Sequence, residues 1–360
     1  MTRSDVSIEI RGLFKVFGSE PRKFVEAIKS GLSKADLGRA HGHVLALNNI
    51  SINIPSGKIQ VVMGLSGSGK STLIRHINRL IEPTSGSIVI DGQDILKMGE
   101  LELREFRRNR TAMVFQKFAL LPHRTVMENV TFGLEIRGTP KVKARDIGMR
   151  WIERVGLHGF DARYPHELSG GMQQRVGLAR ALSNDASILL MDGAYSALDP
   201  LIRTDMQTML LDLQSELKKT IVFITHDLDE ALRLGDRIVI LRDGSIVQQG
   251  DSQDIILRPA DDYITRFVKD VNRGRFVKVE EVMTPVTQSE PGPRPRLTPA
   301  TTLDVAAKVL ADSRFDEAVV IDGDGRPVGL VTLRLLTASM SSASEARSEA
   351  IPVADTPNAA

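Results

Sequence analysis

Apolar and polar residues follow two periodicities along this chain. Four stretches alternate or end in a tight turn and predict strands, at residues 8–10, 13–17, 45–54 and 87–90. Four short apolar runs predict strands buried on both faces, at residues 59–63, 111–115, 187–191 and 220–224. Helical spacing recurs at residues 72–80, 101–109, 126–150, 176–182 and 201–217. Strands that alternate with helices predict an α/β fold with a mainly parallel sheet and helices on both faces.

Two parts of the chain depart from this alternation. Residues 18–42 are mostly polar, with a helical pattern at Phe24, Ile28 and Leu32, and they interrupt the first two strands. After about residue 272 the composition changes, and a short set of helices and strands follows a proline-rich stretch. We therefore expect a first domain over residues 1–272, a small α+β domain over 273–340 and a disordered tail over 341–360.

A glycine-rich loop lies between the strand at 59–63 and the helix that follows it. Its sequence fits G-x-x-x-x-G-K-[ST] at every position, and its residues are Gly64, Ser66, Gly67, Ser68, Gly69, Lys70, Ser71 and Thr72. Glycines let backbone N–H groups converge on phosphate oxygens, and the helix N-terminus adds a partial positive charge. We expect Lys70 to bind the β- and γ-phosphates and the Ser71 hydroxyl to bind Mg²⁺. The alternative is an ordinary turn between a strand and a helix.

Two further motifs carry polar groups to positions where phosphate or metal could bind. Asp192 ends a buried strand, so its carboxylate lies at the carboxyl edge of the sheet and could hold Mg²⁺ rather than only cap a helix. The second motif lies at the start of a predicted helix, and its residues are Ser169, Gly170, Gly171 and Gln173. It could form a separate anion-binding site, or Ser169 could be an ordinary N-cap. Two phosphate sites in one chain suggest that two copies enclose each ATP between them.

Composition narrows the class of protein. The chain has 360 residues, a formal net charge of +2 and no cysteine, so no basic face indicates nucleic acid and no disulfide can form. No secretory signal is visible at the N-terminus, and no stretch approaches the roughly 18 apolar residues of a membrane-spanning helix. Any association with a membrane would then depend on a partner.

With these motifs in order, the chain resembles the ATP-binding subunit of an ABC transporter, a P-loop NTPase with a parallel core, an antiparallel β subdomain and a helical subdomain. The resemblance implies that Gln116 senses Mg²⁺, the attacking water and a membrane partner. It implies that Asp199 belongs to the loop crossing to the second subunit and that His226 contacts the γ-phosphate. Phe17 matches the aromatic residue that stacks on adenine, and Phe14 is the alternative.

The insertion narrows the resemblance to importers of quaternary amines such as glycine betaine, proline betaine and choline. Residues 279–340 also resemble a CBS module, a βαββα regulatory unit, which is present here in one copy. The resemblance implies a homodimer that binds ATP and Mg²⁺ and works with transmembrane permease subunits. It further implies a peripheral position on the cytoplasmic face of the membrane and an extracytoplasmic solute-binding protein that delivers the cargo.

One residue departs from the family pattern. Family members place a glutamate, the general base, directly after the strand-ending aspartate, where this chain has Gly193. A glycine has no side chain that could accept a proton, so we expect firm ATP binding with slow hydrolysis. Two alternatives stay open: an importer of amino acids or other small solutes and, because of Gly193, an ATP-binding regulatory subunit with little turnover.

Overall fold

The computed structural model describes residues 8–116, 118–196, 198–286 and 294–341, and the descriptions below concern those residues. The chain divides into two compact units between Gln249 and Gly250. This division precedes the boundary predicted at residue 272, and all of the predicted tail at 341–360 except Ser341 lies outside the described residues. The two units are described one at a time.

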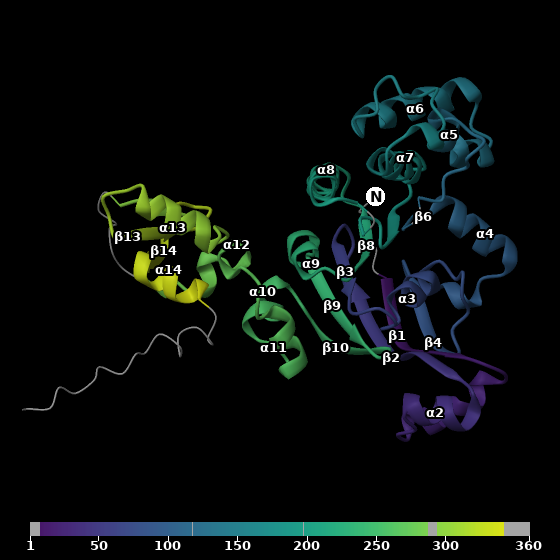
Figure 1. Cartoon of the computed structure of the whole chain (residues 1–360), viewed down its shortest axis with the longest axis horizontal. Coiled ribbons are helices and arrows are strands. Elements are labelled where there is room, and N and C mark those ends of the chain that lie inside the picture. The colour runs from purple at the N-terminus through teal and green to yellow at the C-terminus, as the bar shows by residue number, and fades with distance from the viewer. Residues whose placement is uncertain (1–7, 117, 197, 287–293, 342–360) are drawn as a thin grey trace, which may run out of the picture. The chain divides into compact units, whose positions relative to one another are not determined.

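A six-stranded sheet forms the centre of the first unit, in the order β10-β9-β3-β8-β7-β6 (Figure 1). Its strands are β3 (Ile59–Met63), β6 (Thr111–Phe115), β7 (Ile188–Asp192), β8 (Thr220–Thr225), β9 (Arg237–Arg242) and β10 (Ser245–Gly250). The pairs β3–β8, β3–β9, β6–β7 and β7–β8 are parallel, as the apolar runs predicted. Every residue of β3, β7 and β8 is buried, which explains why these strands read as continuous apolar runs.

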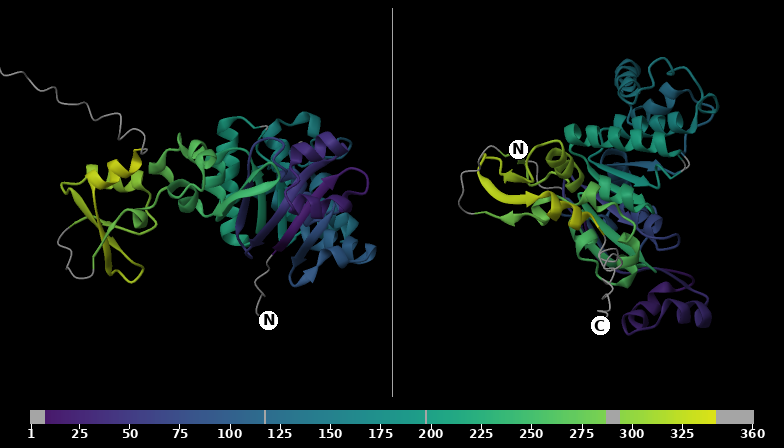
Figure 2. Two further views of the ribbon diagram at one scale, coloured as in Figure 1. Left: turned by 90° about the horizontal axis from the view of Figure 1, so that it is seen from below. Right: turned by 60° about the vertical axis from the view of Figure 1, so that its left-hand side comes forward.

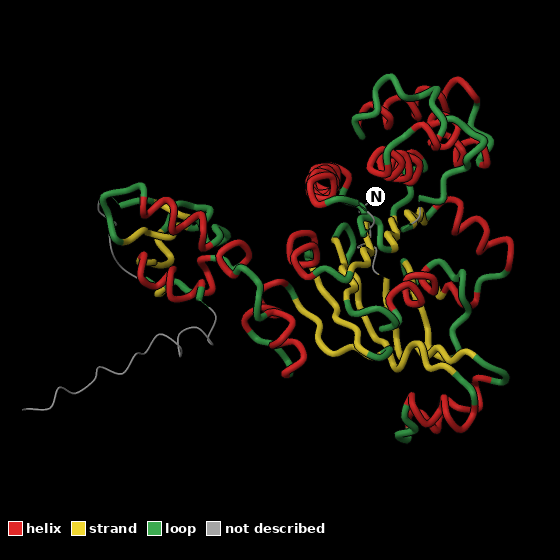
Figure 3. The backbone as a smooth tube through the Cα atoms, viewed as in Figure 1, coloured by secondary structure: helices red, strands yellow, loops and turns green. Residues whose placement is uncertain are grey.

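A second, antiparallel sheet of the same unit has the order β2-β1-β4-β5. Its strands are β1 (Ile8–Phe17), β2 (Val44–Ile54), β4 (Ser85–Ile90) and β5 (Gln93–Asp94). One apolar cluster joins the two sheets and α3 (Lys70–Ile77), since it contains Ile8 and Ile52 from the antiparallel sheet, Val62 and Leu190 from the parallel sheet, and Ile74 from the helix. Figure 3 shows the strands of both sheets in yellow.

The insertion predicted between the first two strands folds into a short 3₁₀ helix, η1 (Pro21–Phe24), and two α-helices, α1 (Val25–Lys29) and α2 (Lys34–His41). The predicted helical pattern is only partly helix, since Phe24 lies in η1, Ile28 in α1 and Leu32 in the connection to α2, after Gly31, whose φ is +108°. Figures 1 and 2 show the insertion at the opposite end of the unit from α5 and α6.

The helical subdomain lies between β6 and β7 in the chain. Its helices are α5 (Val126–Ile136), α6 (Lys141–Arg154) and α7 (Gly170–Ser183), and a 3₁₀ helix, η3 (Pro165–Glu167), leads into α7. The preceding helix, α4 (Glu100–Asn109), packs instead on the core of the two sheets through Leu103 and Phe106. Apolar residues of α5, α6 and α7 share a core that includes Val130, Ile152 and Val176. The stretch with helical spacing at residues 126–150 is divided into α5 and α6 after Gly138, which has a φ of +73°. The remaining helices of the unit are η2 (Ile95–Lys97), α8 (Pro200–Leu217) and α9 (Leu228–Leu234).

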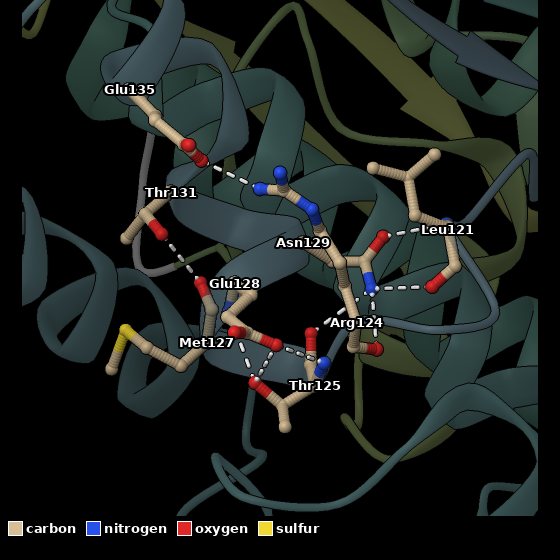
Figure 4. A network of polar contacts seen from close by, with 8 residues as sticks. All are labelled: Leu121, Arg124, Thr125, Met127, Glu128, Asn129, Thr131 and Glu135. Carbon is tan, nitrogen blue, oxygen red and sulfur yellow. Dashed lines mark hydrogen bonds and ion pairs between the residues drawn. The ribbon is translucent and has the colours of Figure 1, made fainter.

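Figure 4 shows a polar network at the start of α5. Asn129 is fully buried, and its Oδ1 accepts a hydrogen bond of 2.8 Å from the backbone N–H of Leu121. Its Nδ2 donates to the carbonyl oxygens of Leu121, Arg124 and Thr125 at 3.0–3.1 Å. Thr125 and Glu128 form a reciprocal cap at the helix N-terminus. The loop that leads into α5 is therefore fixed to the helix by side-chain bonds.

The second unit begins with α10 (Ser252–Leu257), α11 (Asp262–Val268) and α12 (Arg273–Phe276), and a 3₁₀ helix, η4 (Val279–Glu281), follows. Its sheet has the order β11-β14-β13-β12 and is made of β11 (Thr284–Pro285), β12 (Arg296–Leu297), β13 (Glu317–Ile321) and β14 (Pro327–Thr332). With α13 (Leu303–Ala311) and α14 (Leu333–Met340), the chain order β12-α13-β13-β14-α14 is the predicted βαββα order. The strand β12 lies in the proline-rich stretch, ahead of the helices and strands that the sequence predicts for this unit.

Candidate nucleotide-binding site

The glycine-rich loop joins β3 to α3, and two of its glycines lie against neighbouring strands. A Cβ on Gly64, whose φ is +148°, would lie 2.2 Å from the carbonyl oxygen of Leu241 in β9. A Cβ on Gly69, whose φ is +93°, would lie 2.4 Å from the carbonyl oxygen of Ala46 in β2. No other residue fits these two positions, because both the backbone conformation and the close contact exclude a side chain. The loop is therefore held against both sheets of the unit.

Lys70 begins α3, and its side chain reaches back over the loop. Its Nζ donates hydrogen bonds to the carbonyl oxygens of Gly64 at 2.7 Å and Leu65 at 2.9 Å. Burial lowers the pKa of the Lys70 ammonium, and the nearby charge of Asp192 opposes this shift. The ammonium thus lies inside the curve of the loop, where phosphate oxygens could replace the carbonyl oxygens as acceptors.

Ser71 and Asp192 place two oxygen atoms together beside the loop. The Ser71 hydroxyl donates a hydrogen bond of 2.6 Å to Asp192 Oδ1, and Arg75 Nη2 lies 3.5 Å from Asp192 Oδ2. A hydroxyl and a carboxylate are the hard oxygen ligands that Mg²⁺ prefers, with phosphate and water completing the shell. These residues therefore fit a magnesium ion.

Gln116, the third predicted metal-site residue, takes part in a short hydrogen-bond chain. Its Nε2 donates to Ser196 Oγ at 3.0 Å, and Ser196 Oγ donates to the Gly193 carbonyl oxygen at 2.9 Å. Gln116 and Gly193 are thereby connected through one hydroxyl group. This chain links the ends of β6 and β7, the strands that Gln116 and Gly193 follow.

A cavity of about 660 Å³ joins these groups. Its lining includes most of the predicted site residues, namely Phe17, Ser66, Gly67, Gly69, Lys70, Ser71, Thr72, Gln116, Asp192 and His226. Gly64 and Ser68 are buried and support the loop from within. The two aromatic residues considered for adenine stacking differ in exposure. Phe17 is 42% exposed and lines the cavity, whereas Phe14 is 3% exposed and packs in an apolar core. Phe17 is therefore the one available to stack on a base.

The residues of the second predicted phosphate site do not line this cavity. Ser169 caps α7, and its Oγ accepts a hydrogen bond of 3.3 Å from the N–H of Met172. Ser169 and Gly170 are exposed, and Gln173 Nε2 donates to the Leu168 carbonyl oxygen at 3.2 Å. Asp199 caps α8 through a hydrogen bond of 3.0 Å from the N–H of Ile202. Within one chain, the two groups thus form separate surfaces.

Gly193 adopts a conformation that favours glycine. Its φ is +61°, in the left-handed region. Its carbonyl oxygen accepts from Ser196, and the residue lines the cavity next to Asp192. Among the described residues that line the cavity, Asp192 supplies a carboxylate and His226 an imidazole that could accept a proton.

Sequence reasoning did not assign several residues of the cavity. Lys34 comes from the insertion, Val44, Leu45 and Ala46 come from β2, and Thr225 ends β8. None of these residues belongs to a motif with fixed spacing. For the residues of the insertion and of β2, one signal was available in the sequence. The insertion begins directly after Phe17, the expected base-stacking residue, and ends where β2 begins, so both of its ends could be expected near the nucleotide.

Comparison with known proteins agrees with this geometry. Residues 47–196 match the family model for ABC transporters, and residues 279–341 match that for CBS domains. The glycine betaine transport ATP-binding protein OpuAA of Bacillus subtilis is 48% identical over 86% of this chain and 74% of its own length. The glycine betaine/proline betaine transport ATP-binding protein ProV of Salmonella typhimurium is 45% identical over 94% of this chain and 84% of its own length.

A solved structure is also similar. A dimeric ATP-binding cassette in a post-hydrolysis state, bound to ADP and phosphate, is 31% identical with a TM-score of 0.58, and the match covers 68% of this chain and 98% of that one. The similarity thus covers about two thirds of this chain and nearly the whole of the solved one. On these matches, the chain belongs to the family of ABC transporter ATP-binding subunits.

Proposed function

We propose that this chain couples the binding and hydrolysis of ATP to the import of a quaternary amine osmoprotectant through a membrane permease. The observation that carries the proposal is the long match to transport ATP-binding proteins named for glycine betaine, with proline betaine or carnitine as further solutes, at 45–48% identity. Glycine betaine, proline betaine and choline are therefore the solutes to test first.

The rival cargo is an amino acid. A methionine import ATP-binding protein of Staphylococcus haemolyticus is 46% identical, but over 227 residues and 63% of this chain. The betaine proteins match over 311–338 residues. Trimethylamine N-oxide transport proteins, whose solute also carries a methylated nitrogen, match at 47–48% over 270–280 residues. The longer matches favour a methylated amine over an amino acid.

We infer that two copies of the chain enclose ATP between them. One copy contributes the loop with Lys70 and Ser71, and the other contributes the exposed start of α7 at Ser169. Because each copy carries both surfaces, a two-fold dimer would complete two equivalent sites. ATP would close this dimer by satisfying both surfaces at once, and hydrolysis would reopen it.

Each residue of the cavity then has a distinct task. Phe17 stacks on the base, and Lys70 and the N-terminus of α3 bind the phosphates. Ser71, Asp192 and Gln116 would hold Mg²⁺, which neutralises phosphate charge when bound. Gln116, Ser196 and His226 orient the attacking water. Without a carboxylate at Gly193, proton removal depends on these groups, so turnover is slow.

The permease would dock close to Gln116. A groove of about 470 Å³ is lined by apolar residues of β6, α5 and the loop between them, including Phe115, Leu121, Phe132 and Ile136. Asn129 fixes Leu121, which lines this groove, to the start of α5. Among the helices that the structure describes, none combines the length and apolar character that crossing a bilayer requires. We therefore propose a peripheral position on the cytoplasmic side, given by the permease.

Reconstitution tests this function. The chain, its permease and its solute-binding protein are placed in vesicles, and uptake of labelled glycine betaine, choline and methionine is measured together with phosphate release. We expect ATP-dependent uptake of a quaternary amine, and loss of that uptake in Lys70→Ala, while Lys97→Ala, at an exposed position, transports normally. Uptake of methionine instead would favour the amino-acid rival. ATP binding without uptake of any solute would favour a regulatory subunit.

A further inference from the structure

The helical insertion between β1 and β2 carries a lysine to the wall of the nucleotide cavity. Lys34 is the first residue of α2 and lines the cavity together with Phe17 and Val44. Its side chain is 38% exposed, and its Nζ lies 3.4 Å from Asp243 Oδ1. No nucleotide-binding motif of the chain includes this residue. The cavity therefore contains a second lysine in addition to Lys70.

The insertion is packed against the strands that form the cavity wall. Val25, Ile28 and Leu37 are buried in one apolar cluster with Phe14, Val16 and Leu45. Phe14 and Val16 belong to β1, which ends at Phe17, and Leu45 belongs to β2. Because burial of these side chains fixes α1 and α2 on the two strands, the start of α2 is held beside Phe17 and Val44.

His43 joins the two ends of the insertion. Its Nδ1 lies 2.6 Å from the His41 carbonyl oxygen, and its Nε2 lies 2.7 Å from the Ser19 carbonyl oxygen. The ring also contacts that of Phe24, with 4.5 Å between the centroids. A Cβ on Gly18 would lie 2.2 Å from the His43 ring, so glycine is required at that point. These contacts join the start and the end of the insertion at its base.

The position of Asp243 shows which part of a bound nucleotide Lys34 would meet. Asp243 lies in the turn after β9, and the next residue, Gly244, donates from its N–H to the Ser68 carbonyl oxygen at 3.1 Å. The Gly244 carbonyl oxygen accepts from the N–H of Asn48 in β2 at 2.8 Å. Lys34 is thus next to the β2 side of the glycine-rich loop. The groups expected at the γ-phosphate, Gln116, Asp192 and His226, lie instead at the carboxyl ends of β6, β7 and β8.

We propose that Lys34 is an additional nucleotide-binding residue, whose ammonium exchanges Asp243 for the ribose and α-phosphate of ATP. This inference rests on the proposed ATP-binding function. An ion pair between exposed side chains contributes little, whereas a hydrogen bond from an ammonium to a phosphate oxygen is charge-assisted. The exchange is therefore favourable, and the insertion becomes a structural part of the nucleotide site.

The test measures dissociation constants of ATP and ADP for the full chain by titration in the presence of Mg²⁺, at low and high salt. For Lys34→Met we expect a three- to tenfold weaker affinity for both nucleotides, since the contact is to the part that they share. Lys34→Arg keeps the charge and is expected to restore most of the affinity. The control is Lys23→Met, because Lys23 lies in the same insertion but does not line the cavity.

The variant Asp243→Asn distinguishes a direct contact of Lys34 with the nucleotide from a purely structural role of the Lys34–Asp243 ion pair. The asparagine tolerates the φ of +51° at this position and removes the competing charge, so we expect equal or tighter binding of both nucleotides. If Lys34 acted only by holding the turn, Asp243→Asn would weaken binding as Lys34→Met does. Wild-type affinity in Lys34→Met, or a loss for ATP alone, would also overturn the proposal. Absence of ATP binding by the wild-type chain would instead refute the proposed function.

Discussion

Gly193 lies directly against the side chain of Gln116. A Cβ built on Gly193 would meet the Gln116 side-chain carbons at 3.5–3.6 Å, which is ordinary van der Waals contact. Space for a side chain therefore exists at this position, and the backbone conformation, with its φ of +61°, is what favours glycine. Gln116 is also joined to Gly193 by hydrogen bonds through Ser196, so a side chain at position 193 would lie beside the groups expected to orient water.

Gly193→Glu is expected to hydrolyse ATP at least tenfold faster in the assembled transporter, with similar ATP affinity. The glutamate supplies the missing base, and a positioned base contributes about 10²–10⁴-fold. The left-handed conformation would cost about 1–2 kcal/mol of stability. Phosphate release and thermal unfolding are measured together. Gly193→Gln, which has the same shape without a base, is the control, and equal rates for glutamate and glycine would show that another residue removes the proton.

Asn129→Ala is expected to destabilise the chain by about 2–4 kcal/mol, because the N–H of Leu121 and the carbonyl oxygens near it lose their buried partner. ATP affinity should stay unchanged, since Asn129 does not line the nucleotide cavity, while uptake falls. Urea unfolding, nucleotide titration and uptake are compared with those of Thr131→Ala, which loses one hydrogen bond on the same helix. A drop in ATP affinity equal to the drop in uptake would contradict this separation.

Ser169→Arg is expected to abolish dimerisation that depends on ATP and Mg²⁺. The substitution places a large cation at the exposed start of α7, where a partner's nucleotide would lie in the proposed dimer. Size-exclusion chromatography with light scattering measures the mass with and without nucleotide. Ser215→Arg, at an exposed position of α8, adds the same charge and should still dimerise. A wild-type chain that stays monomeric with ATP, alone and with permease, would reject the dimer.

Glu230→Gln is expected to stabilise the chain increasingly as the pH rises. Burial raises the pKa of Glu230, and the charge of Asp227 adds to this, while hydrogen bonds with Thr225 and Gln207 act in the opposite direction. The folded chain therefore holds this proton more tightly than the unfolded chain. Wild-type stability must then fall as the pH increases from the unfolded pKa, near 4.5, through the raised folded value.

Urea unfolding at pH 5 and pH 7.5 tests this linkage. The gain from Glu230→Gln should be larger at pH 7.5, where the wild-type carboxylate is ionised without full solvation. Asp229→Asn, at the preceding exposed position of α9, should show no such increase. A gain that is larger at pH 5 would reverse the sign and contradict the argument.

Truncation after residue 270 is expected to leave ATP binding intact and to change the response of transport to salt. The truncation removes α12 and the whole segment that matches the CBS model, residues 279–341, none of which lines the nucleotide cavity. It also removes the Phe276 carbonyl oxygen, which accepts from Gln253 Nε2 at 2.9 Å. Gln253→Ala in the full chain therefore serves as the control. Identical salt-activation curves for the full and truncated complexes would argue against regulation.

Much of the fold and of the nucleotide site is predictable from local sequence. The glycine-rich loop can be recognised because its glycines, its lysine and the strand and helix beside it lie within twenty residues. The parallel strands are recognised because burial on both faces demands an unbroken apolar run. The helices α10 to α12 were missed because they are only four to seven residues long. Such short helices depend on capping side chains and packing more than on periodicity.

Other features required the folded chain. The choice of Phe17 over Phe14 depends on which face of β1 meets the cavity, and β1 contains irregularities in its pairing that shift this alternation. The contact between Ser71 and Asp192 joins residues 121 positions apart. Lys34 enters the cavity because apolar packing places α2 on β1 and β2. Local sequence thus determined the chemistry of the phosphate loop, whereas tertiary packing decided which distant side chains share its cavity, because only folding brings them within bonding distance.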